Sequence, residues 1–552
     1  MTDGTPWLKR PTRRDVLWTG TAAFGTTVLS GLLPAVVSAA QTTLVVAAPG
    51  TPESLDSEFN PSLGTIDAIG NLYDGLIEYR KVPDPKVQSV MREDIGDYPD
   101  RTGGLDLVGK LAESWSVDPA GKWAEFHLRK GVKSEWGNEL TADDVKWTWD
   151  RKFALHVIGA FWIKILGMTG PDNVKVVDRY TVRFDVPVES PLLLKLQTNL
   201  YNNIYDSTKC KQVATAADPW ARDFLANNSA GFGPYRLGSL QRGQQVIFKG
   251  REDYYHGKPA IDTIVYKEVP ASATRLSLLQ GGAVDVAESL QPLEIEHLKK
   301  EPGIVVDSVT ASPMFWIELN AKMEPFDKVQ VRQAMNHAFP MEQVLDTVFR
   351  GTASAMTGCM PQFYPGFYGG KGALYPYDLN KAKALLSEAG LSNGFKSTLA
   401  YNAGDPVQEP IAILFQSSLR QISVELTLHK IPAATFYAEL SGRTQPMIIF
   451  GDAPWDSDPV YSMQLYFDSK SFQNHSSYKN DEVDKLIAAA SIMADNTKRF
   501  ASMKKVQEIV LHEAPWVFIA FRNYTLARRS NLQGFIYYTP NNLRFQDFHR
   551  AS

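Results

Sequence analysis

The sequence predicts an α/β protein with more than one domain. Alternating or continuously apolar runs typical of strands recur between segments whose apolar residues have helical spacing. At 552 residues the chain exceeds what one core usually serves, so we expect two or three domains. Hydrophobic residues make up 44% of the chain, which excludes a disordered protein. No internal repeat is visible, which argues against a solenoid.

The N-terminal segment has the pattern of a twin-arginine signal peptide. The string TRRDVL at residues 12–17 precedes an apolar stretch at residues 19–37, which ends in the small residues Ser38–Ala40. No cysteine follows, so a lipoprotein anchor is not expected, and no later apolar run is long enough for a membrane span. We therefore predict that residues 1–40 are removed near Ala39 or Ala40 and that the protein is free in the periplasm.

Charge and cysteine usage narrow the function class. The net charge of −4 becomes −6 once four basic and two acidic residues leave with residues 1–40. A mildly acidic chain without a Lys/Arg stripe is not expected to bind nucleic acid. Cys210 and Cys359 are the two cysteines, and they lie far apart in the sequence. Geometry decides whether they form a disulfide, so the bonded and free states are both open.

The first elements follow from local patterns. Residues 43–48 (TLVVAA) read as a first strand, whereas residues 80–106, rich in Pro, Asp and Gly, read as a surface loop. Residues 111–128 predict a hairpin around the turn string DPAG. A helix is expected after Thr141, because Asp144 three residues later completes a capping pattern.

The same signals place the later elements. Alternation around Asp178 predicts a second hairpin at residues 174–186. Apolar runs, helical spacing and glycine stops predict the remaining elements: a helix near 275–280 followed by a short strand, a strand at 316–320, a helix opening at 325–327, a helix at 381–389, strands at 398–401 and 447–450, and helices at 483–487 and 500–510.

Several strings, in this order and spacing, carry a resemblance to a known family. They are LAESW at 111–115, LRKGVK at 128–133, LTADDV at 140–145, the GFGPY segment within 230–237, and the second-lobe strand and helix at 316–338. Together they resemble family 5 of the extracellular solute-binding proteins, the dipeptide, oligopeptide and nickel receptors of ABC importers. The sequence departs from the family pattern at residues 134–137 (SEWG) and at Phe232.

The resemblance implies a fold and a division into domains. It implies the type II periplasmic-binding-protein fold, in which two α/β lobes are joined by a hinge and an extra domain is inserted in the first lobe. We expect the following boundaries: lobe I at 41–75, 205–285 and 525–552, the inserted domain at 76–204, and lobe II at 286–524.

The resemblance also implies a function. It implies a receptor without enzymatic activity or cofactor, a monomer that captures a peptide or peptide-like solute between its lobes. The solute would pass to the permease and ATPase subunits of an ABC importer. Family members also bind oligosaccharides, opines, nickel and other metal chelates, so a receptor for a non-peptide solute is the second hypothesis.

A secreted hydrolase is a third hypothesis. Gly390-Leu391-Ser392-Asn393-Gly394 matches the G-x-S-x-G pattern. However, Ser392 follows a predicted helix and precedes a predicted strand, which is the reverse of a nucleophile elbow. The nine histidines show no zinc spacing, so no metal site is expected.

The candidate ligand site follows the apolar strand at 447–450. Asp452, Asp456 and Asp458 lie there together with Trp455. Loops at strand ends face clefts in α/β proteins, and an ammonium group removed from water needs a carboxylate partner. The resemblance implies that an Asp of this segment holds a peptide α-amino group, and either Asp452 or Asp456 fits. Turn chemistry for Asp458 and a solvated role for Asp456 are the structural alternatives.

Aromatic side chains are expected to form the walls of that site. Phe, Tyr and Trp together make up 11% of the chain, and most of them are expected to serve core packing. Trp455, Phe315 and Trp316 are the candidates for lining side-chain pockets, because aromatic rings supply rigid apolar surface.

Overall fold

The structure is a computed structural model, and it describes residues 42–58, 62–95, 107–119, 121–156, 158–370, 374–493 and 495–551. The predicted signal peptide at residues 1–40 lies outside the described residues. None of the helices in the described part of the chain combines the length and apolar character that a bilayer crossing requires.

Half of the strands in the described part of the chain belong to one mixed sheet. Strand β1 (Thr43–Ala48) lies between β12 (Thr263–Glu268) and β13 (Val286–Ala287) and is parallel to both. Beyond β12 the sheet continues antiparallel through β11 (Gln245–Gly250) and β10 (Tyr235–Gln241). We call these five strands the first half-sheet. The first strand predicted from the sequence is confirmed.

A second half-sheet holds β18 (Met447–Asp452), β16 (Phe395–Asn402) and β17 (Val424–Ile431), with β16 parallel to both neighbours. The strands predicted at 398–401 and 447–450 are confirmed within β16 and β18. Residues 447–450 of β18 are buried on both faces, as their unbroken apolar sequence requires.

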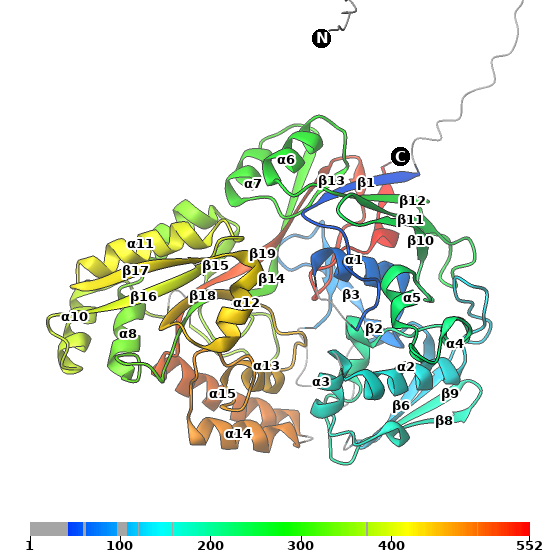
Figure 1. Cartoon of the computed structure of the whole chain (residues 1–552), viewed down its shortest axis with the longest axis horizontal. Helices are drawn as coiled ribbons and strands as arrows, with labels where there is room; N and C mark the ends of the chain where they lie inside the picture. The colour runs from blue at the N-terminus through cyan, green and yellow to red at the C-terminus, as the bar shows by residue number, and fades with distance from the viewer. Residues whose placement is uncertain are drawn as a thin grey trace, which may run out of the picture. The chain divides into compact units, whose positions relative to one another are not determined.

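Two long antiparallel strands join the half-sheets, β14 (Ile304–Leu319) and β19 (Trp516–Arg529). The end of β19 pairs with β13, and the end of β14 pairs with β18. The register between the two strands shifts between Thr310 and Met314, so they are irregular where they pass from one half-sheet to the other. Figure 1 shows both strands running between the helical groups on either side. A short strand, β15 (Ala353–Ala355), also pairs with β19.

Helices lie around each half-sheet (Figure 1). Near the first are α1 (Leu63–Leu72), α6 (Ser272–Gln280) and α7 (Pro292–Leu298). The chain around the second half-sheet contributes α8 (Val329–His337), α9 (Met341–Val344), α10 (Leu379–Glu388), α11 (Gln408–Arg420), α12 (Ala433–Gly442), α13 (Pro459–Phe467), α14 (Asp481–Ser491) and α15 (Asn496–Glu513).

One predicted helix start is wrong. The helix expected to open at residues 325–327 begins at Val329. The preceding residues form turns instead, in which the Phe326 N–H donates to the Met323 carbonyl. The helix predicted at 381–389 is present as α10, which begins two residues earlier behind its cap, Asp378.

The segment between β2 (Ile77–Tyr79) and β10 contains a separate four-stranded sheet. Strands β6 (Ala112–Val117), β7 (Trp123–Leu128), β9 (Thr181–Asp185) and β8 (Val174–Asp178) pair antiparallel in that order, which confirms both predicted hairpins. Helix α2 (Ala142–Leu155) starts where predicted, and the Thr141 N–H donates to Asp144 at 2.8 Å. Helices α3 (Ile158–Ile165), α4 (Ser207–Val213) and α5 (Arg222–Asn227) follow.

The described part of the predicted surface loop at 80–106 is partly ordered into strands. Strands β3 (Lys81–Pro83) and β4 (Met91–Glu93) pair with each other, and β4 also pairs with β21 (Ile536–Tyr537). The sequence signal failed because each strand is only three residues long. Other short pairs are β2 (Ile77–Tyr79) with β5 (Leu107–Gly109), and β20 (Leu532–Gln533) with β22 (His549–Arg550).

Both cysteines are buried and free, which decides the open question of a disulfide. The thiol of Cys359 lies 3.9 Å from the Met463 sulfur. The described chain from residue 42 onward forms one compact unit, and the lobe boundaries given above stay a prediction.

Candidate ligand-binding site

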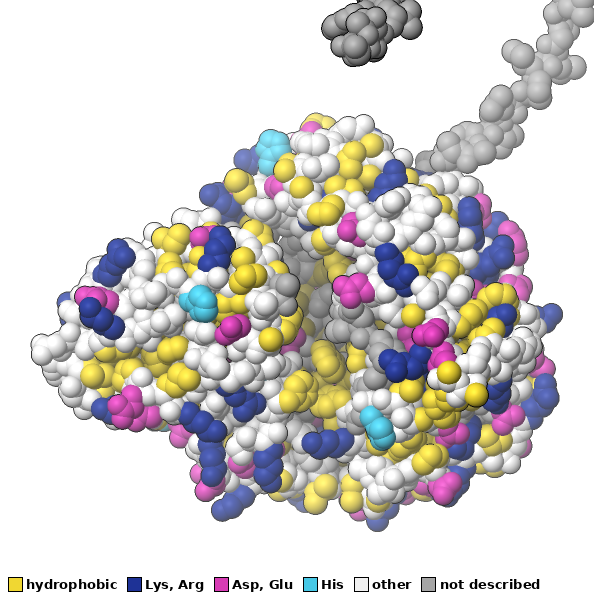
Figure 2. Space-filling model, viewed as in Figure 1, with side chains coloured by type: hydrophobic (Ala, Val, Ile, Leu, Met, Phe, Trp, Pro, Cys, Tyr) yellow, Lys and Arg dark blue, Asp and Glu magenta, His cyan; other side chains and the backbone are white. Residues whose placement is uncertain are grey.

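A cavity of about 330 Å³ lies where the loop after β18 meets the first part of the chain. Figure 2 shows that this face of the molecule is hollowed between its two helical groups. The lining comes from many segments: α1, β2, β4 and residues 198–201 on one side, α12, the end of β18, residues 453–457 and Gln473 on the other, and the C-terminal residues 539–544. We call this space the first cavity.

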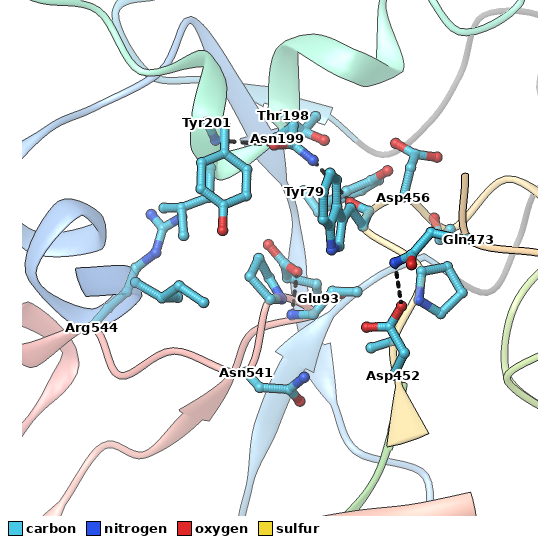
Figure 3. A pocket seen from close by; sticks show the side chains of 18 of the residues that line it. Tyr79, Glu93, Thr198, Asn199, Tyr201, Asp452, Asp456, Gln473, Asn541 and Arg544 are labelled. Atoms are coloured by element: carbon cyan, nitrogen blue, oxygen red, sulfur yellow. Dashed lines mark hydrogen bonds between the residues drawn. The ribbon is translucent and has the colours of Figure 1, made fainter. Parts of the chain in front are cut away.

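Asp452, at the end of β18, presents its carboxylate to the first cavity (Figure 3). The Tyr466 hydroxyl donates to it at 3.0 Å and the Gln473 amide at 3.2 Å. Within the described residues no Lys, Arg or His forms an ion pair with it. Burial raises the pKa of Asp452 to about 6, and the Ala453 N–H and the Tyr466 hydroxyl offset only part of this effect.

Asp456 lines the same cavity but has a cation of its own. Lys195 Nζ lies 3.3 Å from the Asp456 carboxylate, and both side chains are buried. Burial raises the pKa of Asp456, whereas Lys195 acts to lower it. The loop is also held from the same side by Asn199, whose side-chain amide donates to the Trp455 carbonyl at 2.8 Å.

Asp458 has the position and contacts of a helix cap. Its carboxylate accepts the N–H groups of Val460 and Tyr461 at the start of α13. Arg499 Nη2 lies 3.0 Å from each of its oxygens, and both side chains are fully buried. Burial acts to raise the pKa of Asp458, but Arg499 and Lys195 outweigh it, so the pKa is lowered. Asp458 is absent from the lining of the first cavity.

Phe315 lines a second cavity of about 300 Å³, which adjoins the first at Tyr437, Phe450, Asp452 and Ala453. Its neighbour Trp316 packs in a different hydrophobic cluster from Phe315. There Trp316 stacks on Trp516 with ring centroids 4.1 Å apart. Trp316 belongs to the core, and no cavity described here includes it.

Arg522 on β19 lines the second cavity and also a third, of about 400 Å³. Its side chain is 38% exposed, and its nearest carboxylate oxygen, on Asp405, is 4.0 Å away. The lining of the second cavity therefore holds two carboxylates, Asp452 and Asp405, and the Arg522 guanidinium, which lies nearer to Asp405.

Aromatic side chains form much of the wall of the first cavity. Trp455 lies 6.2 Å from Tyr201 and Tyr437 lies 6.3 Å from Phe450, measured between ring centroids. Tyr79 is also in the lining. Tyr437 is 67% exposed although it lines both the first and second cavities, so its ring stands at the opening.

Sequence reasoning found only one side of this site. Asp452, Trp455 and Asp456 line the first cavity and Phe315 lines the second, whereas Trp316 and Asp458 lie elsewhere. The ligand-binding roles predicted for all six residues stay predictions. The lining residues that were missed come from segments hundreds of residues apart, and no local pattern marks them: Tyr79, Glu93, Asn199, Tyr201, Tyr437, Gln473, Arg522 and Arg544.

The G-x-S-x-G string at residues 390–394 is explained by the turn that follows α10. The glycines around Ser392 follow the end of α10, and Gly390 and Gly394 have positive φ angles of 78° and 73°. The Ser392 hydroxyl lies 3.0 Å from that of Ser387. No group of three or more potential metal ligands is found in the parts of the chain that the structure describes.

Comparison with known proteins gives consistent results. The family model for bacterial extracellular solute-binding proteins, family 5 Middle, matches residues 106–474. A probable D,D-dipeptide-binding periplasmic protein of Escherichia coli is 29% identical over 442 residues, covering 79% of this chain and 83% of its own. Heme-binding protein A of Haemophilus influenzae is 26% identical over 440 residues, covering 76% and 80%.

The fold has close counterparts among solved structures. A periplasmic binding protein of Helicobacter pylori, solved with the peptide STSA, superposes with a TM-score of 0.77 at 25% identity and covers 92% of this chain and 98% of its own. The two-lobed α/β fold implied by the sequence resemblance is confirmed by these neighbours. Because the family model covers well over half of its residues, this chain belongs to family 5 of the bacterial extracellular solute-binding proteins.

Proposed function

We propose that this protein is the periplasmic receptor of an ABC importer for a peptide or peptide-like solute. The observation that carries the proposal is the charge environment of the Asp452 carboxylate. It is a carboxylate in a cavity, and it has no cation partner among the described residues, whereas Asp456 and Asp458 each pair with a buried cation. A ligand ammonium group would supply the missing partner.

The position of Arg522 supports a ligand with opposite charges at its ends. Asp452 and Phe521 both pair with Met314 of β14, so their Cα atoms lie about 10 Å apart across two strand spacings. Arg522 follows Phe521 directly. An extended dipeptide spans about 7 Å. A short peptide would therefore fit with its ammonium group at Asp452, its carboxylate near Arg522, and its first side chain in the first cavity.

Main-chain groups in the second cavity and a hinge between the lobes would also contribute to ligand capture. Gly451 and Ala453 line the second cavity, where main-chain groups can bind a peptide without reading its sequence. We propose that β14 and β19 form the hinge between the two lobes, because they alone join the half-sheets within the described chain. The names of relatives that bind D,D-dipeptides or a tetrapeptide are consistent with a peptide ligand.

We also propose a route of export and a monomeric state for the protein. The twin-arginine motif at Arg13 and Arg14 would direct the folded chain to the periplasm as a monomer without a lipid anchor. Replacing both arginines with lysine should leave the protein in the cytoplasm, and normal secretion of that variant would refute this route.

A thermal-shift screen tests the receptor function. Dipeptides, longer peptides, oligosaccharides, opines and metal chelates are added singly to the purified protein, since a ligand that binds only the native state raises Tm. A shift with peptides supports the proposal. Shifts confined to opines, sugars or chelates would replace the peptide with that solute class while keeping the receptor function.

A further inference from the structure

We propose that the first cavity selects solutes with two cationic groups, namely peptides whose first residue is basic. The proposal rests on the proposed function and names the class of ligand that the same site prefers. In this arrangement the α-ammonium group binds Asp452, and the side-chain cation lies against Glu93 on the opposite wall.

The wall around Asp452 is short of one cation. Its buried or partly buried carboxylates are Asp452, Asp456 and Asp458. The cations that pair with them are Lys195 and Arg499. One negative charge is left, and it resides on Asp452, which has only hydroxyl and amide donors.

The wall around Glu93 is also short of one cation. Its carboxylates are Asp74, Glu78, Glu93 and Asp547, and the cations among them are Lys81, Lys110 and Arg544. Lys110 contacts Asp74, while Arg544 Nη1 lies 3.2 Å from Glu78. Lys81 Nζ lies closer to Glu78, at 3.5 Å, than to Glu93, at 3.8 Å. Burial acts to raise the pKa of Glu78, but Lys81, Lys110 and Arg544 lower it to about 2.

Glu93 has weak compensation and faces the cavity. Lys81 Nζ is 3.8 Å from its carboxylate, beyond hydrogen-bond distance, and Lys81 already donates to the Tyr79 carbonyl. The Thr539 N–H donates to Glu93 at 2.8 Å, which leaves further acceptor positions on the carboxylate. Glu93 and Asp452 both line the first cavity (Figure 3).

Among the described residues of the lining, Arg544 is the one cation, and it is not placed to bind an anionic side chain. Its guanidinium is held by Glu78 and lies 4.4 Å from the Tyr538 ring centroid. The neighbouring carboxylates Glu78 and Glu93 would repel a second anion. The positive charge of Arg544 is therefore balanced by Glu78 on the same wall of the cavity.

The aromatic walls favour the same ligand. Tyr79, Tyr201, Tyr437 and Trp455 line the same cavity as the two carboxylates. Ring faces attract cations, and the attraction is stronger in sites removed from water. A lysine side chain combines an apolar stem, which suits these rings, with a terminal cation that Glu93 can accept. A cavity of about 330 Å³ has room for one such side chain.

Isothermal titration calorimetry with three matched dipeptides tests the proposal. Lysyl-alanine, norleucyl-alanine and glutamyl-alanine differ in the charge of the first side chain, and the first two have nearly equal length. We expect lysyl-alanine to bind about tenfold more tightly than norleucyl-alanine, and glutamyl-alanine to bind most weakly. 1,5-Diaminopentane is added as a dication without a peptide bond.

Two variants locate the preference. Glu93→Gln keeps the acceptor for Thr539 but removes the charge, so the ratio of the two affinities should fall to about one while norleucyl-alanine binds as before. Tyr437→Leu, at a largely exposed position, keeps apolar surface but removes a ring face, and should lower the ratio about threefold. Glu113→Gln, at an exposed position of β6, is the charge-matched control and should leave the ratio unchanged.

The outcomes separate this inference from the function on which it rests. Equal or tighter binding of norleucyl-alanine would overturn the dication preference while keeping a peptide receptor. Binding of diaminopentane without any dipeptide would overturn the peptide function and keep a cation-selective cavity. Failure of all four compounds would overturn both. A ratio that survives in Glu93→Gln and in Tyr437→Leu would place the preference outside the first cavity and so refute the proposal.

Discussion

The His475 Nε2 atom lies 2.8 Å from the side-chain oxygen of Gln473. Burial and the nearby Arg443 lower the pKa of His475 to about 4, so the ring is neutral at pH 7. When Nε2 carries the proton it donates to the Gln473 oxygen, and the Gln473 amide nitrogen then faces Asp452. These two contacts orient the Gln473 side chain so that its N–H group donates to Asp452 and stabilises the ionised carboxylate.

Ligand binding should depend on pH through Asp452. Its pKa is raised to about 6, so the negative charge that would hold a ligand ammonium group is lost as the pH falls below 6. The affinity for dialanine should fall about tenfold per pH unit below that value, and also above about 8, where the α-amino group loses its proton. Gln473→Leu removes a donor to the carboxylate, so the acidic limb should move to higher pH. An acidic limb that is identical in Gln473→Leu and wild type would contradict this account of the contact.

The buried pair of Lys195 and Asp456 should be essential for stability. Lys195→Met leaves the carboxylate buried without its cation, and we expect a loss of about 3–5 kcal/mol in the free energy of unfolding. Adding Asp456→Leu to the same chain should recover much of that loss, because no charge is then stranded. Urea unfolding measures each value.

An exposed pair provides the control for that experiment. Lys122 and Glu189 lie 3.7 Å apart with side chains 56% and 40% exposed. Lys122→Met should change the free energy of unfolding by less than about 0.5 kcal/mol. Equal effects of the two lysine replacements would show that the buried pair has no special contribution.

Glu318 should make stability depend on pH. Its oxygens accept the indole N–H groups of Trp316 at 2.9 Å and Trp516 at 2.8 Å, and burial raises its pKa to about 8 despite these donors. Between the ordinary value of 4.5 and about 8, the unfolded chain has lost this proton and the folded chain retains it. Stability should therefore decrease with rising pH over this window, by about 1.4 kcal/mol per unit from this group.

The variant Glu318→Gln isolates that contribution. It cannot titrate, so the difference in stability between wild type and variant should itself decrease as the pH rises from 5 to 8 and level off above 8. Chemical unfolding at a series of pH values measures the difference. A difference that stays constant across this range would show that Glu318 is ionised in the folded protein.

Arg522 should read the carboxylate end of a short peptide. We expect Arg522→Gln to weaken dialanine binding about tenfold or more, while dialanine amide, which lacks the carboxylate, is affected little. The control is Arg420→Gln, an exposed position in the last turn of α11. If Arg522→Gln weakens both compounds equally, the guanidinium does not contact the carboxylate.

Local patterns in the sequence were sufficient to predict most elements. Both hairpins of the β6–β9 sheet and the start of α2 follow turn and capping signals, which act within a few residues. Elements that depend on distant partners were missed. Strand β4 has three residues and is fixed by β3 and β21, which is more than 400 residues away.

The residues of the candidate site also divide into those that a local pattern predicted and those that it missed. Asp452, Trp455 and Asp456 were predicted because they follow a strongly apolar strand, whose end faces a cleft in α/β folds. Their different roles could not be predicted, since Lys195 and Arg499 are what separates Asp456 and Asp458 from Asp452. Glu93 and Arg522 belong to short or hinge strands, and only the tertiary fold brings them to the cavities.

The most direct test of the central claim compares dialanine with N-acetyl-dialanine in wild type, Asp452→Asn and Asp456→Asn by isothermal titration calorimetry. If Asp452 holds the ammonium group, wild type binds dialanine and rejects the acetylated compound, and Asp452→Asn loses about 3 kcal/mol of binding free energy for dialanine. Asp456→Asn retains the discrimination between the two compounds. If Asp452→Asn binds dialanine as wild type does, or if wild type binds both compounds equally, Asp452 is not the ammonium site.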